Sequence, residues 1–392
     1  MIAIGAIVKD EFNHLEEWVA WHILQGFPKF FIADNGSSDG TCEYLEALEK
    51  YGICQTLKIP SKEKNQSKTY NELVNKFGDQ CYAIAFIDAD EFICPSNPSI
   101  NSGETQKSAD IIAATLENTE AAAIALNWKV FGSSGQIAKM PGLTIDRFNQ
   151  CSDDTRFINH HIKSVVRPTR IKKMHVHHAE PIGRFNYVNA AGESIKFFKG
   201  SNNKTETLNS TEFTRDICKN IRVNHYIVRS KQEFLEKKAR RGWLNTGPSV
   251  ELENYFSVHD LNDTECLSAK IHVNFVEKAI SDLRENLKIH TDFYKTYAGK
   301  IEHLDKYSIG GWCSEKFSDS PTKARVKVCV NDIFCAEFSA LKYREDVILA
   351  GINKTGETGF HYIFDNPLSK GDRVKVGLVG NNFRFQQNEF II

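Results

Sequence analysis

Residues 82–92 read YAIAFIDADEF, an apolar run that ends in three acidic residues, Asp88, Asp90 and Glu91. Carboxylates are seldom buried without a partner, because removing them from water carries a large free-energy cost. We therefore predict a buried strand at residues 82–88, and we expect its acidic tip to face a cation.

The chain around this run alternates apolar stretches with segments of helical periodicity. The expected strands are residues 1–8, 29–34, 53–59, 82–88 and 122–128, and the expected helices are residues 13–26, 39–50, 67–77 and 108–117. Strands joined by single helices predict right-handed crossovers and a mostly parallel sheet with helices on both faces. Ligands of such sheets bind beyond the carboxyl ends of the strands, which is where Asp34 and Asp88 lie.

The pattern changes twice further along the chain. Helical periodicity dominates from about residue 210 to 300, and short strands separated by turn residues follow from about residue 303. Short strands without intervening helices predict a small antiparallel β-sandwich. We therefore expect an α/β domain at residues 1–245, a helical connector at 246–302 and a β-sandwich domain at 303–392.

The composition limits the compartment and the class of protein. The chain has 10 cysteines and no C-x-x-C pair, which argues against a zinc ribbon or a disulfide scaffold and favours reduced thiols. No apolar run reaches the length of a transmembrane helix, and residues 1–8 are too short to be one. We expect a cytoplasmic protein.

Positive charge is concentrated in residues 160–241, which hold 18 Lys and Arg against 7 Asp and Glu. Such a block suits phosphates or an anionic surface, although a solvated face is an equal alternative. Lys237 and Arg241 share one face of an expected helix at i,i+4 spacing. We expect this patch to face an acidic partner, either a lipid-linked acceptor at the inner face of the membrane or a phosphorylated glycan.

Asp88 and Asp90 form the strongest candidate site. In an extended strand tip, side chains two residues apart point the same way, so both carboxylates can face one cation. Their oxygen atoms suit Mg²⁺ or Mn²⁺, which bind a few carboxylates and otherwise substrate phosphates. The alternative is a pair of solvated loop acids, and the position after a buried strand favours the metal.

A second candidate site is the sequence DNGSSDGT at residues 34–41. Asp34 can accept hydrogen bonds from a base or a ribose, and the glycines allow the backbone to approach a ligand. The segment also fits a strand-to-helix turn in which Asp39 caps the helix. It lacks the G-x-G-x-x-G pattern, so we do not predict a dinucleotide site.

The third candidate is the sequence HVHH at residues 175–178. Alternation places His175 and His177 on one face of an extended segment. One of them can complete the metal shell of Asp88 and Asp90, because imidazole is a suitable ligand for Mn²⁺. A structural role is the alternative, and a zinc site made of histidines alone is less favoured.

Six segments of the chain resemble the motifs of bacterial GT-A glycosyltransferases, between family 2 and the galactan-synthase-like family 92. They are, in order, VKDEFNHLEEWVAWHILQGF, FIADNGSSDGT, FIDADEF, NWKVFGSSG, KSVVRP and VNHYIVRSKQEFLEKKARRG, and they span about residues 1–245. The resemblance implies a nucleotide-sugar-binding α/β domain of the GT-A fold. It also implies that Asp34 lies near the nucleotide and that Asp88 and Asp90 hold a divalent ion on the donor diphosphate.

The same resemblance bears on the histidines and on the end of the chain. His177 falls where these enzymes carry a late metal-binding histidine, and His175 stays an open alternative. The strand-rich C-terminal part resembles a sandwich module often joined to such transferases, which implies acceptor binding or assembly.

The implied activity is metal-dependent transfer of a sugar from a nucleotide-diphosphate donor, with a UDP-sugar expected, to a hydroxyl of a cell-surface glycan or glycolipid. We expect Mn²⁺ or Mg²⁺ as the cofactor, inversion at the anomeric carbon, and a role in polysaccharide biosynthesis. The residues expected to bind the donor are Lys9, Asp34, Asn35, Gln66, Asp88, Lys163 and Arg167. Inversion needs a carboxylate that takes the acceptor proton, and we expect Asp146 in this role, with Asp153 and Asp154 next.

Two other classes of protein stay open. A sugar nucleotidyltransferase also uses an α/β fold, a metal and acids, but is expected to carry a glycine-rich basic loop after the first strand. This chain has Lys9, Asp10 and Glu11 there. A non-catalytic glycan-binding or scaffold protein would use its C-terminal domain, and intact Asp88 and Asp90 argue against it. We expect no nucleic-acid partner.

Overall fold

The chain forms two compact units. The computed structural model describes residues 1–37, 39–60, 65–96, 106–198, 213–214, 220–240, 249–288, 297–316, 324–379, 381, 383, 385, 387 and 389–392. The first unit comprises residues 1–37 and 43–287, and the second comprises residues 38–42 and 288–392. The segment expected to be a connector, 246–302, lies partly in each unit, and its boundaries stay a prediction.

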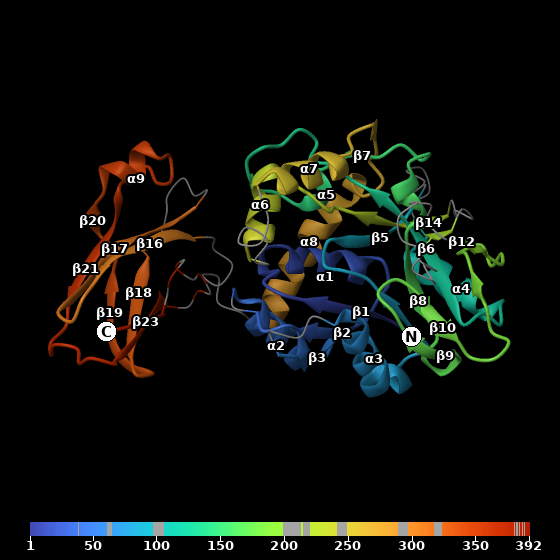
Figure 1. Ribbon diagram of the computed structural model, residues 1–392, viewed down its shortest axis with the longest axis horizontal. Coiled ribbons are helices and arrows are strands. Elements are labelled where there is room, and N and C mark those ends of the chain that lie inside the picture. Colours follow the sequence, from blue (N-terminus) through green and yellow to red (C-terminus); the bar gives the residue numbers. More distant parts are fainter. Residues whose placement is uncertain are drawn as a thin grey trace. The chain divides into compact units, whose positions relative to one another are not determined.

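The first unit is built around a nine-stranded sheet (Figure 1). Its strands are β1 (Ile2–Val8), β2 (Lys29–Asp34), β3 (Cys54–Lys58), β4 (Ala83–Phe86), β5 (Glu91–Pro95), β6 (Ala123–Val130), β8 (Ile162–Val166), β11 (Tyr187–Val188) and β14 (Ile221–His225). They are ordered β3-β2-β1-β4-β8-β6-β14-β5, and β11 pairs with β6. Most pairs are parallel; β8 runs antiparallel between β4 and β6, and β5 runs antiparallel to β14.

Helices connect and cover these strands. They are α1 (Phe12–Leu24), α2 (Thr41–Tyr51), α3 (Gln66–Phe77), α4 (Ser108–Glu117), α5 (Thr144–Arg147), α6 (Lys231–Arg240), α7 (Ser249–His259) and α8 (Val273–Leu287). The remaining short strands are β7 (Gln150–Cys151), β9 (Ile171–Met174), β10 (Ala179–Pro181), β12 (Phe197–Phe198), β13 (Phe213–Thr214) and β15 (Thr264–Glu265). The predicted fold class, an α/β protein with a mostly parallel sheet, is confirmed. The sequence analysis did not predict β5, β8, β11 and β14; of these, β8 lies in the middle of the sheet and β14 lies next to the edge strand β5.

Helix α1 lies along the outer edge of β5 and uses its side chains to bind that strand's backbone. The indole Nε1 of Trp18 donates to the carbonyl of Glu91 at 2.8 Å, and that of Trp21 donates to the carbonyl of Ile93 at 2.9 Å. The N–H of Ile93 donates to Nε2 of His22 at 3.2 Å. Because both indoles and this imidazole are fully buried, the contacts fix the start of β5, directly after the acidic turn.

His22 should make the first unit less stable in acid. Burial lowers the pKa of His22 to about 3, while the unfolded chain titrates near 6.5. As the pH falls from about 7 towards 3, His22 becomes protonated in the unfolded state but stays neutral in the folded state, so the free energy of unfolding decreases. Between pH 7 and pH 5 the loss attributable to His22 is about 2 kcal/mol.

Urea unfolding of His22→Gln at both pH values measures this effect. The variant should lose about 2 kcal/mol less than the wild type between the two pH values. His361→Gln, at an exposed position of the second unit, is the control and should behave as the wild type. An equal pH dependence in His22→Gln and the wild type would contradict the prediction.

The second unit contains two four-stranded antiparallel sheets, ordered β16-β17-β21-β20 and β19-β18-β22-β23. Its elements are β16 (Tyr297–Leu304), β17 (Ser308–Glu315), β18 (Arg325–Val330), β19 (Ile333–Ser339), β20 (Lys342–Tyr343), α9 (Glu345–Leu349), β21 (Glu357–Ile363), β22 (Arg373–Leu378) and β23 (Glu389–Ile391). Side chains of both sheets, among them Ile309 and Val326, share one apolar core. The antiparallel strands expected after residue 303 are confirmed, and the first of them begins earlier, at Tyr297.

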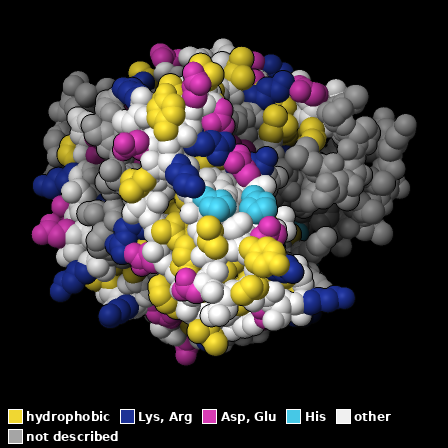
Figure 2. Space-filling model, turned by 90° about the vertical axis from the view of Figure 1, so that its left-hand side faces the viewer, with side chains coloured by type: hydrophobic (Ala, Val, Ile, Leu, Met, Phe, Trp, Pro, Cys, Tyr) yellow, Lys and Arg dark blue, Asp and Glu magenta, His cyan; other side chains and the backbone are white. Residues whose placement is uncertain are grey.

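The surface of this unit mixes side-chain types. Figure 2 shows a face on which apolar side chains, in yellow, lie between charged ones and beside histidine side chains, in cyan. Single exposed apolar residues such as Ile333 and Ile363 are normal on protein surfaces. Across both units, none of the described helices is long and apolar enough to cross a membrane.

Candidate active site

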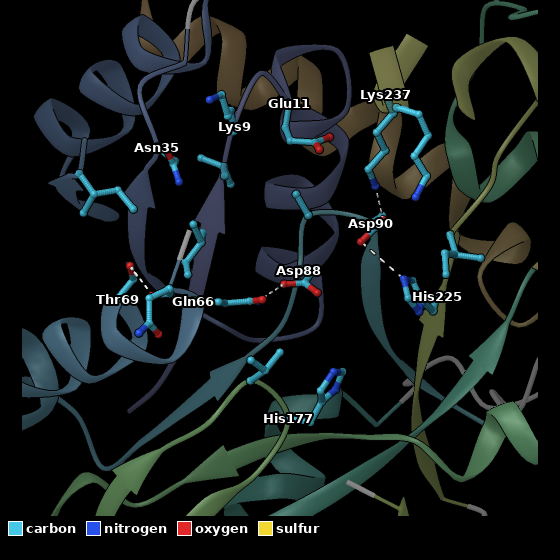
Figure 3. A pocket seen from close by; sticks show the side chains of 18 of the residues that line it. Lys9, Glu11, Asn35, Gln66, Thr69, Asp88, Asp90, His177, His225 and Lys237 are labelled. Carbon is cyan, nitrogen blue, oxygen red and sulfur yellow. Dashed lines mark hydrogen bonds and ion pairs between the residues drawn. The ribbon is translucent and has the colours of Figure 1, made fainter. Parts of the chain in front are cut away.

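A pocket of about 570 Å³ opens at the edge of the large sheet where β1, β2, β4 and β14 end (Figure 3). This is the edge at which an α/β sheet ordinarily binds its ligand. Six of the residues predicted from the sequence to form the site line the pocket. They are Lys9, Asn35, Gln66, Asp88, Asp90 and His177.

Asp88 and Asp90 lie in a tight turn between β4 and β5, and not in the extended strand tip that the sequence suggested. The N–H of Glu91 donates to the carbonyl of Asp88 at 3.0 Å, and the N–H of Asp88 donates to Oε2 of Glu91 at 2.7 Å. Alternation of side chains does not apply in such a turn. Each carboxylate therefore has its own set of partners.

Asp88 faces the floor of the pocket. Its Oδ2 accepts from Nζ of Lys163 at 2.8 Å, and its Oδ1 accepts from Gln66 and from the hydroxyl of Tyr70, both at 3.2 Å. Burial raises the pKa of Asp88, but the ammonium of Lys163 outweighs this effect and the pKa is lowered. Asp88 is therefore a carboxylate at neutral pH.

Asp90 faces the opposite wall. Its Oδ2 lies 2.5 Å from Nζ of Lys237, and its Oδ1 lies 3.7 Å from Nε2 of His225. Burial opposes ionisation, yet Lys237 and His225 lower the pKa of Asp90 well below its usual value. The two acids of this turn thus stay ionised because each has a different cation beside it.

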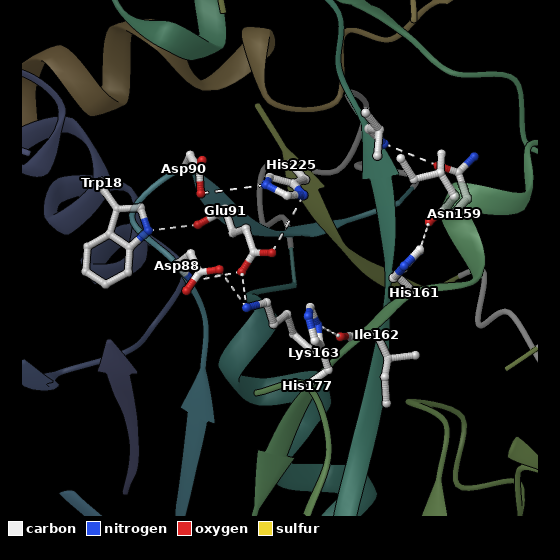
Figure 4. A network of polar contacts seen from close by, with 12 residues as sticks. Trp18, Asp88, Asp90, Glu91, Asn159, His161, Ile162, Lys163, His177 and His225 are labelled. Atoms are coloured by element: carbon white, nitrogen blue, oxygen red, sulfur yellow. Dashed lines mark hydrogen bonds and ion pairs between the residues drawn. The ribbon is translucent and has the colours of Figure 1, made fainter. Parts of the chain in front are cut away.

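Glu91 directly follows Asp90, is fully buried, and has its carboxylate beside that of Asp88 (Figure 4). Its Oε2 is 3.4 Å from Nζ of Lys163, and its Oε1 is 3.8 Å from Nδ1 of His225. Burial raises the pKa of Glu91 to about 7, although Lys163 opposes the rise. Lys163 therefore connects Glu91 to Asp88 beneath the pocket.

His177 and His225 present imidazole rings to the pocket and are held by Trp128. The ring of Trp128 makes edge contacts with His177 at 5.4 Å and with His225 at 4.4 Å between centroids. Nδ1 of His177 must donate to the carbonyl of Ile162 at 3.1 Å, because a carbonyl only accepts. Burial lowers the pKa of His177 to about 3, so the ring is neutral and Nε2 keeps its lone pair.

The chemistry of these side chains fits a divalent ion that takes only part of its ligands from the protein. Within the described parts of the chain, no three His, Cys, Asp or Glu side chains form a ready-made cage. Mg²⁺ and Mn²⁺, however, commonly take only one or two carboxylates and complete their shell with phosphate oxygens and water. Asp88 and Asp90 can supply the carboxylates, and a neutral histidine with a fixed tautomer is a suitable additional ligand.

Two of the predicted donor-binding residues, Asp34 and Lys163, are buried and do not line the pocket. Asp34 is 2% exposed and accepts hydrogen bonds from the N–H of Ser37 at 3.2 and 3.3 Å, so it shapes the turn after β2. Lys163 is 1% exposed and is occupied by the two carboxylates described above.

Arg167 does not line the pocket. Its guanidinium is buried and donates to the hydroxyl of Tyr82 at 2.6 Å and to the carbonyls of Leu116 and Thr119. Leu116 is in the last turn of α4, where carbonyls lack helical partners and cations are stabilising. Arg167 therefore binds the end of a helix, and the structure does not place it near a donor.

The three acids predicted as the proton acceptor also lie outside the pocket lining. Asp146 is 3.3 Å from Nζ of Lys270, and Asp154 is bound to Lys129 at 2.5 Å. Asp153 accepts hydrogen bonds from Thr155 in an exposed turn. The acids that do line the pocket, within the described residues, are Glu11, Asp88 and Asp90.

His175 also points away from the pocket. Its Nε2 is 2.7 Å from Oε1 of Glu180, and its ring stacks on His178 at 4.5 Å. Between the two histidines that the sequence left open, only His177 lines the pocket.

Several pocket residues were missed from the sequence. Glu11, His225, Lys238 and Tyr255 all line the pocket. His225 lies within a segment that carried the family resemblance, and recognising that segment as a strand would have brought it beside Asp90.

Lys237 was expected in an exposed patch with Arg241, and this expectation is wrong for Lys237. Its side chain is only 14% exposed and turns into the pocket towards Asp90. Arg241 lies outside the described residues, so that part of the predicted patch has no structural account.

The family model for glycosyltransferase family 92 matches residues 5–238, more than half of the chain. The chain therefore belongs to glycosyltransferase family 92. All the pocket residues except Tyr255 fall within the matched segment.

The matches to individual relatives are short, and their sequence identity is low. A family 92 protein of Oryza sativa subsp. japonica is 26% identical over 100 residues, which cover 25% of this chain and 17% of the relative. One of Arabidopsis thaliana is 25% identical over 91 residues, covering 23% and 16%. The chain thus aligns with about a sixth of the length of these relatives.

Solved structures show only a distant likeness. The S. aureus protein TarS in complex with UDP gives a TM-score of 0.29 at 13% identity, covering 43% of this chain and 47% of that one. The mannosyltransferase PcManGT from Pyrobaculum calidifontis, in complex with GDP-Man and Mn²⁺, gives 0.23 at 12% identity, covering 32% and 34%.

Proposed function

We propose that this protein transfers a sugar from a nucleotide-diphosphate donor to a hydroxyl group of an acceptor glycan. The observation that carries the proposal is the acidic turn of Asp88 and Asp90 at the ligand-binding edge of the sheet, inside the segment that matches family 92. Cationic residues surround this turn, as a diphosphate requires.

The donor is a UDP-sugar in this proposal, and Asp88 and Asp90 hold Mn²⁺ or Mg²⁺ with one imidazole, from His177 or His225. The bound ion supplies positive charge to the leaving diphosphate. The protein itself supplies Lys9 and Lys238 on the pocket wall, and Asn35 and Gln66 offer amide groups to the nucleotide. Trp128 fixes the two imidazoles, so that this part of the pocket is preorganised.

Inversion requires a carboxylate within reach of the acceptor hydroxyl, and Asp146, Asp153 and Asp154 stay the candidates from the sequence. Single substitution of each by asparagine tests them, and loss of transfer in one variant would support that residue. A cell-surface glycan or a glycolipid at the membrane is the proposed acceptor.

Donor hydrolysis without acceptor tests the proposed function directly. The wild type should release UDP or GDP from one member of a panel of UDP- and GDP-sugars in the presence of Mn²⁺. Replacing Mn²⁺ with EDTA should lower this rate at least about tenfold, because the leaving diphosphate then lacks its main counter-charge. Release of pyrophosphate from UTP and a sugar 1-phosphate would instead identify a nucleotidyltransferase. Failure to hydrolyse or bind any donor would overturn the proposed sugar transfer.

A further inference from the structure

The two ammonium groups beside the acidic turn reach it from different directions. Lys163 comes from β8 in the floor, is 1% exposed and stays between Asp88 and Glu91. Lys237 comes from α6 across the pocket, is 14% exposed and touches Asp90 alone among these acids. Lys237 is therefore the ammonium with room to change partners (Figure 3).

Helix α6 itself is fixed near its start. Glu233 receives two hydrogen bonds from Arg147, at 3.1 and 2.7 Å, and Phe234 is 1% exposed in a small apolar cluster. Lys237 lies one turn further along. Its long side chain can therefore move its Nζ through the pocket while the helix stays in place.

Charge balance dictates when that movement is favourable. A divalent ion at Asp90 would lie beside the ammonium of Lys237, and two cations at this distance repel each other. A nucleoside diphosphate brings at least two negative charges into the same pocket. A charge left unpaired in a buried site costs several kcal/mol, so the ammonium and the incoming phosphate favour pairing.

We propose that Lys237 occupies the cation position on Asp90 in the empty enzyme and moves to the donor diphosphate when a divalent ion takes that position. The inference rests on the proposed function, because it assumes a nucleoside-diphosphate donor and a divalent ion in this pocket. Lys237 thereby weakens binding of the metal alone and strengthens binding of the nucleotide with the metal. The two ligands then bind cooperatively.

Calorimetric titration of Lys237→Met with two probes tests this exchange. Removing a cation next to a carboxylate commonly changes its affinity for a proton by one or more pKa units. We therefore expect Mn²⁺ alone to bind about tenfold more tightly than in the wild type. UDP added to the Mn²⁺-saturated variant should bind about tenfold more weakly, because a charge-assisted hydrogen bond is lost.

Lys231→Met is the matched control. Lys231 lies on the same helix, but its Nζ pairs with Glu253 at 2.9 Å, and neither residue lines the pocket. The Lys231→Met substitution removes the same charge and should leave the dissociation constants for Mn²⁺ and for UDP within about twofold of the wild type. Lys237→Arg keeps the charge and should also resemble the wild type. If circular dichroism shows that Lys237→Met is unfolded, Lys237→Gln replaces it with the same expected directions.

The other outcomes overturn the exchange. Weaker binding of both probes would mean that Lys237 only supports the structure. Tighter binding of Mn²⁺ with unchanged binding of UDP would exclude the contact between Lys237 and the phosphate. Unchanged binding of Mn²⁺ would exclude competition between Lys237 and the ion for Asp90.

Failure of the proposed function would look different. A wild type that binds neither probe would overturn the proposed function together with this inference. Another result would overturn only the transferase activity. In that case the wild type binds both Mn²⁺ and UDP, and Lys237→Met binds Mn²⁺ more tightly and UDP more weakly, but no donor sugar is hydrolysed.

Discussion

The Asp90→Asn variant is expected to lose sugar transfer by about a thousandfold or more while keeping its fold. Asparagine has the volume of aspartate, so no cavity forms, but the negative charge is lost. Lys237 and His225 then lack their shared anion, and a divalent ion loses one of its two carboxylates. Release of nucleotide diphosphate from the donor, with and without Mn²⁺, measures the effect.

Asp110→Asn provides the control for Asp90→Asn. Asp110 is an exposed acid in the first turn of α4, so the same chemical change should leave transfer within about twofold. Circular dichroism and urea unfolding check that both variants fold. An Asp90→Asn enzyme within tenfold of the wild type would contradict the role of Asp90. Equal wild-type activity in Mn²⁺ and in EDTA would contradict the metal.

The largest effect on stability is expected for Lys163→Met, at about 3–5 kcal/mol. Lys163 is fully enclosed between Asp88 at 2.8 Å and Glu91 at 3.4 Å. Removing the ammonium leaves two carboxylates close together, one of them entirely buried, without the cation that separates them. The loss should be visible as a lower midpoint in urea unfolding.

The pH dependence of this loss gives a second readout. The pKa of Glu91 is already raised to about 7 by burial in the wild type, and the variant removes the cation that opposes this rise. A raised folded-state pKa contributes stability at low pH that is lost as the pH rises through it. Lys163→Met should therefore be destabilised more at pH 8 than at pH 6.

Lys58→Met is the matched control for burial. Lys58 also lies 2.8 Å from a carboxylate, that of Glu46, but the two side chains are 65% and 56% exposed. The expected loss is at most about 1 kcal/mol, since water replaces the lost partner. If both lysine variants lost the same stability, burial would not be the reason for the effect at Lys163. Adding Glu91→Gln to Lys163→Met should recover part of the loss.

The local pattern of the sequence was enough to predict the outer part of the sheet and the place of the ligand. Strands β1, β2 and β4 are apolar runs, and the helices between them repeat at helical spacing, so each element is specified by its own residues. The position of Asp88 at a strand's carboxyl end then followed from topology alone. Local sequence patterns predict such elements because the spacing of the apolar residues determines which side of the strand or helix is buried.

Strands β8 and β14 could not be predicted in the same way. Strand β8 contains Lys163, and β14 contains Asn224 and His225, which look exposed in a sequence but are buried in the structure. Their burial depends on partners from distant segments, such as Asp88 for Lys163. A polar residue therefore indicates a core strand only when its partner from a distant segment is known.

The direction in which long side chains point could not be predicted from the sequence either. The charge pattern placed Lys237 on an outer patch, but a helix of mixed composition does not reveal which face meets a pocket. Arg167 looked like a donor ligand because it stands near the histidines in sequence. Its actual partners are carbonyls near the end of α4, a contact between segments about 50 residues apart.

The contacts of α1 with β5 also govern how the large sheet can associate with other chains. Strand β5 is the last in the sheet order, and an edge strand ordinarily offers free backbone groups to a strand from another molecule. Here the carbonyls of Glu91 and Ile93 and the N–H of Ile93 are already occupied by Trp18, Trp21 and His22. The edge beside the acidic turn is thereby closed to strand addition, so aggregation by edge-to-edge pairing is blocked on this side of the sheet.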